Sequence, residues 1–80
     1  MNATVKAAPV HIGSTVTYTE SATGDHRTVH IVVRGESDAT HGLLSDVSPV
    51  GRALLGHRAG ELVRLRAPRG ERHLRIDTVV

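Results

Sequence analysis

The chain has 80 residues, of which 39% are hydrophobic and 22% charged, and its formal net charge is +2. This length allows one small domain with a modest core, and the lack of cysteine excludes disulfides, zinc–thiolate sites and thiol catalysis. Tyr18 is the only aromatic residue, so the core must consist of aliphatic side chains. The first fifteen residues hold neither a secretion signal nor a membrane-spanning run, and we expect a cytoplasmic protein.

The first half of the chain predicts a short leader followed by a β-hairpin. Residues 1–10 show no periodicity, and we expect them to be a loosely ordered leader to a single domain formed by residues 11–80. Threonines alternate with Val16 and Tyr18 in the first strand. A turn cluster at residues 22–25 leads to a second alternating run at residues 28–33, which completes the hairpin.

The second half predicts one short helix between strands. A polar loop at residues 34–42 leads to a short strand over Leu43–Val47. Ser48 can cap a helix that has Pro49 in its first turn, and Gly56 can end that helix. Two further alternating strands are expected, at residues 62–67 and 74–78. The pattern predicts an α+β fold, with an antiparallel sheet of about five strands and one short helix on its concave face.

The helical segment also carries a family resemblance. The run Ser48-Pro49-Val50-Gly51-Arg52-Ala53-Leu54-Leu55-Gly56 is similar to the signature of the C-terminal domain of the Gre transcript-cleavage factors (GreA and GreB). The similarity extends through Gly60-Glu61 and the turn Ala67-Pro68-Arg69-Gly70-Glu71, and covers roughly residues 10–79. It implies an FKBP-like fold, and nucleoside diphosphate kinase regulators share this domain.

The resemblance also implies a partner. The family domain docks on bacterial RNA polymerase, at the rim of the secondary channel, on a coiled coil of the largest subunit. The contact is made just before the helix, which here places it at Val47, Ser48 and Pro49, with Val50 behind them and Arg52 on the helix. The family's N-terminal coiled coil carries an acidic tip, whereas the ten residues before this domain contain no acid. We therefore expect polymerase binding that modulates transcription without transcript cleavage.

Asp46 stands where the resemblance expects an apolar residue, and it motivates an alternative function. By period 2 it shares the face of Leu44, so its carboxylate would be buried and need a partner, unless a register shift lets it reach solvent. Asp46 as acid or base, with Tyr18 and His57 as polar helpers, would give a cofactor-independent isomerase or cyclase acting on a small molecule. We do not favour enzymatic activity. Proline isomerisation is not expected, because such pockets are lined with aromatic residues.

The sequence gives weaker support for metal, cofactor or nucleic-acid binding. His26 and His30 lack a third ligand at suitable spacing, so we expect neither a metal nor a cofactor. A single tyrosine makes no stacking platform, so direct nucleic-acid binding is not expected. An Arg face on the last two strands could grip phosphates, but solvated edge charges are favoured there; its members are Arg64, Arg66, Arg72 and Arg75. Binding to a partner other than polymerase, or self-association, stays open.

Overall fold

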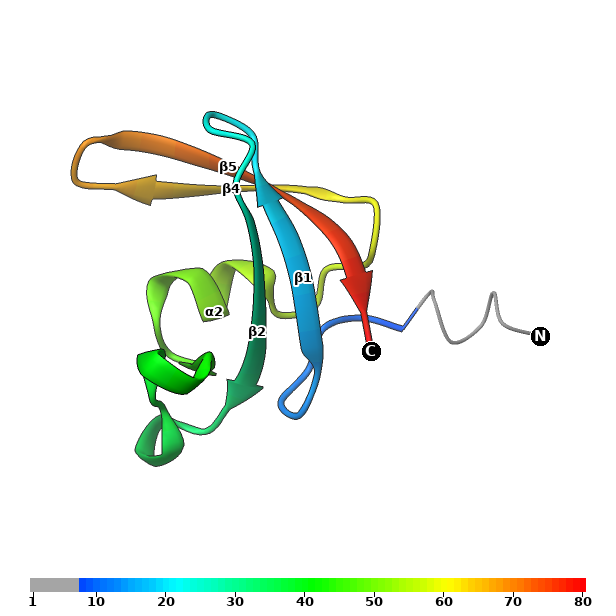
Figure 1. Cartoon of the computed structure of the whole chain (residues 1–80), viewed down its shortest axis with the longest axis vertical. Coiled ribbons are helices and arrows are strands. Elements are labelled where there is room, and N and C mark those ends of the chain that lie inside the picture. The colour runs from blue at the N-terminus through cyan, green and yellow to red at the C-terminus, as the bar shows by residue number, and fades with distance from the viewer. Residues whose placement is uncertain (1–7) are drawn as a thin grey trace.

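The computed structural model describes residues 8–80, which form five strands, one short α-helix and two 3-10 turns (Figure 1). The strands are β1 (Thr15–Glu20), β2 (His26–Val32), β3 (Leu43–Ser45), β4 (Leu62–Ala67) and β5 (Gly70–Val79). The helix α2 covers Pro49–Leu54, and the 3-10 turns are η1 (Arg34–Glu36) and η2 (Ala39–His41). No helix in this part of the chain is long and apolar enough to cross a membrane.

The five strands form one curled sheet in the order β3-β2-β1-β5-β4, and α2 lies on its inner side (Figure 1). The predicted α+β class, with five strands and one short helix, is confirmed. The helix has only six residues, which is too short for independent stability, so it depends on packing against the sheet. Leu54 of α2 is fully buried in the core, and Val50 and Ala53 pack against it.

The predicted hairpin of β1 and β2 is present, and its register places Tyr18 opposite Arg27 and Thr19 opposite His26. Val16, Tyr18 and, from β2, Ile31 point into the core, while the threonines of β1 point outward. The second strand starts at His26, two residues before the predicted start. His26 and His30 therefore both lie within β2.

The third strand corrects the expectation of a wholly antiparallel sheet. β3 pairs with β2 in parallel, with His30 opposite Leu43 and Val32 opposite Ser45. The segment 33–42, which contains η1 and η2, carries the chain back along β2 and makes this direction possible. The strand also ends at Ser45, two residues before the predicted Val47, because residues 46 and 47 form a turn.

The last strand is longer than predicted and contains a bulge. β5 begins at Gly70, so a two-residue turn at Pro68 and Arg69 connects it to β4. Its pairing with β1 shifts between Thr17, which faces Thr78, and Tyr18, which faces Ile76. Asp77 is the extra residue at this bulge, and a bulge of this kind redirects the side chain that it carries.

The core is aliphatic apart from Tyr18, as the composition requires, and its members are Val10, Val16, Tyr18, Ile31, Leu54, Val63, Leu74, Ile76 and Val79. Val10 belongs to the predicted leader, but it is buried, and its backbone bonds to His57 and Gly56. The packed unit therefore includes this end of the leader. Residues 1–7 of the leader lie outside the described residues.

Candidate functional site

The turn that joins β3 to α2 is held by two serines. The Ser48 hydroxyl donates to the Ser45 carbonyl at 2.7 Å and accepts from the Gly51 backbone N–H at 3.0 Å, which caps the helix. The Ser45 hydroxyl in turn accepts from the Val47 backbone N–H at 3.1 Å. Each of these bonds satisfies a group at a strand or helix end that would otherwise lack a partner. The loop shape is therefore fixed by its own hydrogen bonds.

Gly51 allows the helix to approach the end of β3 more closely than any other residue would. A Cβ atom built on Gly51 would lie 2.1 Å from the Ser45 carbonyl oxygen and 2.9 Å from the Ser48 hydroxyl. The first of these atoms is backbone and cannot move without disturbing β3. The glycine of the sequence motif thus has a steric role that is independent of its backbone angles.

The loop that these contacts hold presents apolar groups to solvent. Val47 is 43% exposed, Pro49 and Arg52 are exposed, and Val50 is half-buried against the core. We call residues 47–50 the docking loop. A hollow of about 310 Å³ lies beside it, lined by Leu44, Ser48, Pro49, Val50, Leu65, Arg66, Ala67, Pro68 and Arg72. The predicted binding residues Ser48, Pro49 and Val50 thus line a hollow whose other wall is the β4–β5 hairpin.

Two further hollows adjoin this one. A hollow of about 150 Å³ shares Leu44 with it and is lined by Tyr18, Arg27, Val29, Ala39, Gly42, Leu43 and Leu44. Another, of about 340 Å³, runs along the hairpin tip and is lined by residues 67–72. The inner groove is our name for the hollow beside the docking loop together with the 150 Å³ hollow that shares Leu44 with it. Both lie on the side of the sheet that faces α2.

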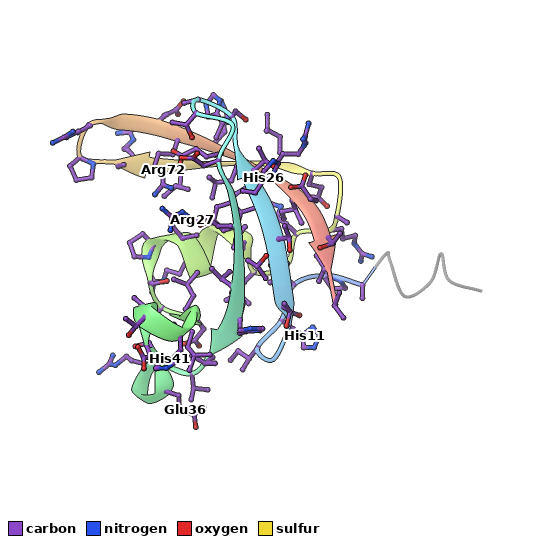
Figure 2. All side chains as sticks on the ribbon, in the orientation of Figure 1. His11, His26, Arg27, Glu36, His41 and Arg72 are labelled. Carbon is purple, nitrogen blue, oxygen red and sulfur yellow. The ribbon has the colours of Figure 1, made fainter. Side chains whose placement is uncertain are left out.

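An ion pair secures the hairpin wall of the inner groove. Arg72 donates through Nε and Nη2 to the two carboxylate oxygens of Glu20, at 2.9 and 3.0 Å. These hydrogen bonds, with the charges of Arg72 and Arg27, hold the pKa of the Glu20 carboxyl below its usual range. A two-point contact of this kind fixes the orientation of both side chains as well as their separation. Figure 2 shows Arg72 and Arg27 above α2.

The three residues of the enzymatic alternative lie in different settings. Tyr18 is 4% exposed and lines the smaller part of the inner groove. His57 bonds through Nδ1 to Glu61 at 2.7 Å, and this bond holds the pKa of the Glu61 carboxyl below its usual range. Asp46 and His57 line none of the three hollows described above. The acid–base role of this set stays a prediction.

Asp46 itself follows the end of β3, so the alternation that placed it on the Leu44 face does not reach it. Its backbone N–H still bonds to the Val32 carbonyl at 2.8 Å. The side chain is half-buried, and its Oδ1 atom is buried without a hydrogen-bond partner. We expected a buried Asp46 carboxylate to have a partner, but residues 8–80 provide no hydrogen bond to this Oδ1 atom.

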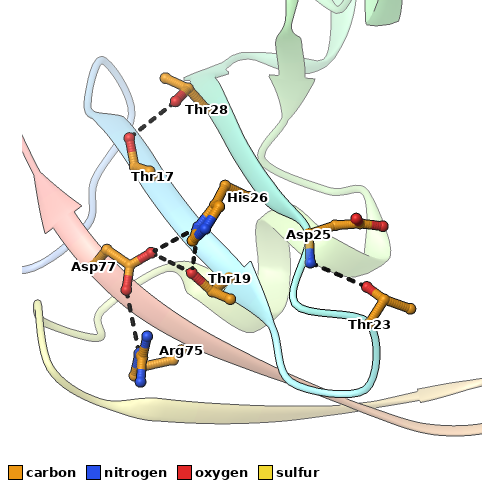
Figure 3. Close-up of polar contacts among 8 residues, drawn as sticks. All are labelled: Thr17, Thr19, Thr23, Asp25, His26, Thr28, Arg75 and Asp77. Carbon is orange, nitrogen blue, oxygen red and sulfur yellow. Dashed lines mark hydrogen bonds and ion pairs between the residues drawn. The ribbon is translucent and has the colours of Figure 1, made fainter.

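The outer face of the sheet carries a different arrangement, shown in Figure 3. The Thr19 hydroxyl donates to Asp77 Oδ2 at 2.6 Å and lies 2.8 Å from His26 Nδ1, and Arg75 donates to Asp77 Oδ1 at 3.2 Å. Because the Thr19 proton points to the carboxylate, His26 Nδ1 must be the donor in its bond to Thr19. The Thr19 hydrogen bond is the main cause that holds the pKa of Asp77 below its usual range.

The predicted Arg face is split between the two sides of the sheet. Arg64 and Arg66 point outward with Arg75, because they alternate with the inward-facing Val63 and Leu65 of β4. Arg72 points the other way and bonds to Glu20, so the four arginines do not form the single face that the sequence left open. The histidines of β2 bond to threonines of β1. Residues 8–80 bring together no group of three or more side chains placed to hold a metal.

Arg27 is the functional candidate that the sequence reasoning missed. Its position opposite Tyr18 follows from the hairpin register. Counting outward from the predicted turn at residues 22–25 would have placed Arg27 on the face of Tyr18. The Glu20–Arg72 pair, by contrast, joins residues that are 52 positions apart. No local pattern in the sequence indicates it.

Comparison with known proteins supports one family. The family model described as "Transcription elongation factor, GreA/GreB, C-term" matches residues 5–79. The chain is 48% identical over 70 residues to transcription elongation factor GreA of Thermomicrobium roseum, and 36% identical over 72 residues to transcription inhibitor protein Gfh1 of Thermus aquaticus. Each match covers 88% of this chain, but only 44% and 46% of the respective relative. The chain thus spans less than half the length of these relatives.

Solved structures agree with the sequence matches. The crystal structure of Thermus aquaticus Gfh1 superimposes with a TM-score of 0.80 at 33% identity, covering 91% of this chain and 48% of that one. The elongation factor GreA/GreB from Nitrosomonas europaea gives a TM-score of 0.71 at 28% identity, covering 89% and 59% respectively. The fold and the sequence motif therefore point to the same relatives.

Proposed function

The chain belongs to the family of the C-terminal domains of the transcription elongation factors GreA and GreB, and on that premise we propose that it binds bacterial RNA polymerase and modulates transcription. We propose the docking loop as the contact surface. The site on the polymerase would be the coiled coil of its largest subunit at the rim of the secondary channel. Such a role places the protein in the cytoplasm, where the polymerase works.

The observation that carries the proposal is a rigid loop that presents apolar side chains to solvent. Val47 and Pro49 are exposed, although the backbone around them is fixed by the bonds of Ser45 and Ser48. A loop that is already ordered loses little conformational entropy on binding, so its contacts contribute more fully to affinity. An exposed apolar loop beside a hollow is typical of a protein–protein contact.

Each residue of the loop has a separate role in this proposal. Val47 and Pro49 make the apolar contact, and Val50 supports them from the core side. Ser48 maintains the loop through its two hydrogen bonds. Arg52, exposed on the second turn of α2, provides a cation at the edge of the contact.

The test is binding to purified bacterial core RNA polymerase by the immobilised chain. Val47→Arg is the informative variant, because this side chain is exposed and only its backbone takes part in the loop bonds. We expect wild-type binding in the micromolar range or tighter, and at least about tenfold weaker binding by the variant. A separately expressed fragment of the largest-subunit coiled coil should compete for the wild-type chain.

Leu62→Arg is the matched control, since Leu62 is 58% exposed on β4 and receives the same substitution away from the docking loop. It should bind as the wild type does. Absence of wild-type binding to the polymerase would rule out the proposed function. Equal weakening by both variants would show that the docking loop is not the contact.

A further inference from the structure

The inner groove has an apolar floor. Leu44 lies between its two parts, and Val50 and Leu65 flank the larger part next to the docking loop. All three side chains are half-buried and pack against the core, and this packing holds them in position. A hollow of about 310 Å³ is large enough for one or two apolar side chains of a partner.

The charge at the edge of the groove is not balanced. Arg72 and Arg27 both lie here, and Glu20 is the carboxylate that bonds to Arg72 through both of its oxygens. Arg27 is close enough to Glu20 to lower the pKa of that carboxyl, but its guanidinium has no hydrogen bond or ion pair among residues 8–80. Both oxygens of Glu20 are thus bonded to Arg72, and Arg27, which lines the smaller part of the groove, has no carboxylate bonded to it among residues 8–80.

We propose that the inner groove receives a protein segment in which an apolar side chain is followed closely by a carboxylate. The apolar side chain occupies the hollow between the docking loop and the β4–β5 hairpin, and the carboxylate binds Arg27 on the far side of Leu44. The inference rests on the proposed function and extends it, because it makes the groove the continuation of the docking loop and gives the partner segment an acidic, apolar character.

Two observations favour a protein segment over a nucleic acid. The lining of the larger hollow is mainly aliphatic side chains and prolines, which match apolar side chains rather than phosphates. Tyr18, the single aromatic ring, is 4% exposed and so cannot stack on a base. Arginine on such a rim donates in a planar fork that fits a carboxylate.

The experiment measures the affinity of core RNA polymerase for the chain with Arg27→Gln, with Arg27→Lys and with the matched control Arg64→Gln. Arg64 is exposed on the outer face of β4 and has no ion pair among the described residues. We expect about tenfold weaker binding for Arg27→Gln, partial recovery for Arg27→Lys, and less than about a twofold change for Arg64→Gln. The salt dependence of binding should also become shallower in Arg27→Gln alone.

Thermal unfolding of each variant shows whether it is folded, and the Arg27→Lys chain provides a second readout in which the charge is kept. If the wild type binds polymerase and Arg27→Gln binds within about twofold of it, the groove proposal fails while the proposed function stands. If the wild type does not bind, both fail. If Arg27→Gln leaves polymerase binding intact but abolishes binding of an oligouridine probe, the groove takes phosphates and the proposal is overturned.

Discussion

The inner and outer faces of the sheet are stabilised in different ways. On the inner face, the docking loop depends on close backbone approach, with Gly51 against the Ser45 carbonyl and Ser48 bonded on both sides. On the outer face, exposed threonines bond to neighbouring histidines, as in the 2.7 Å contact between Thr15 and His30. A steric contact with backbone cannot relax, whereas a lost surface bond is replaced by water. Substitutions should therefore be costly on the inner face and mild on the outer one.

The two faces also differ in how their charges are matched. The outer carboxylate of Asp77 is bonded by both Thr19 and Arg75. The inner groove leaves Arg27 without such a partner. Arg27 lines an apolar hollow and has no carboxylate bonded to it, so the comparison favours the inner face as the functional one.

The strongest test of the comparison is Gly51→Ala. The added methyl group would overlap the Ser45 carbonyl, and we expect a loss of about 3 kcal/mol in the free energy of unfolding, measured by urea denaturation. Gly35→Ala is the control, because Gly35 has open space around it and no positive φ angle. That change should leave stability the same or slightly higher. Similar stability of both variants would contradict the steric role of Gly51.

Ser48→Ala should have the next largest effect. The change removes the helix cap and the bond to Ser45, so we expect a loss of about 1.5 kcal/mol in the free energy of unfolding. Ser37→Ala removes one long, exposed bond to the Arg34 carbonyl and should cost less than about 0.5 kcal/mol. Polymerase binding by Ser48→Ala should weaken as well, because the docking loop loses its fixed shape. Equal costs for the two serines would contradict the structural role of the Ser48 hydrogen bonds.

On the outer face, Thr19→Val keeps the side-chain shape but removes the hydroxyl that joins Asp77 and His26. We expect a loss of about 1 kcal/mol in the free energy of unfolding. Thr17→Val is the control, since its hydroxyl meets only Thr28, at 3.0 Å on the exposed surface, and it should change stability by less than about 0.5 kcal/mol. A cost for Thr19→Val larger than that for Ser48→Ala would reverse the comparison.

The smallest effect is a pH dependence of the Thr19→Val difference. The Thr19 bond lowers the folded-state pKa of Asp77, so it stabilises the fold above the unfolded-state pKa of about 3.9, and this part is lost as the pH falls through the folded value. The stability gap between wild type and variant should be constant from pH 7 to about pH 5 and shrink below about pH 4. A gap that widens in acid would contradict the assignment of Thr19 as the donor.

The fold could be predicted well from the sequence where local patterns decide it. Alternation placed Val16 and Tyr18 on the inner face, and Ser48, Pro49 and Gly56 set the ends of the helix to within a residue or two. The parallel direction of β3 could not be predicted, because it depends on how the loop at 33–42 packs. The length of β5 was missed for a related reason: its first residues pair only with β4 and show no clear alternation of their own.

The candidate site divides in the same way. The sequence by itself determined the aliphatic core, the strand faces and the motif from Ser48 to Gly56, because each follows from the chemistry of neighbouring residues. Only the tertiary structure decided that Arg72 bonds to Glu20, that Gly51 meets the Ser45 carbonyl, and that Arg27 has no partner at the inner groove. These are contacts between segments that come together only after the sheet has curled around α2, and no local periodicity encodes them.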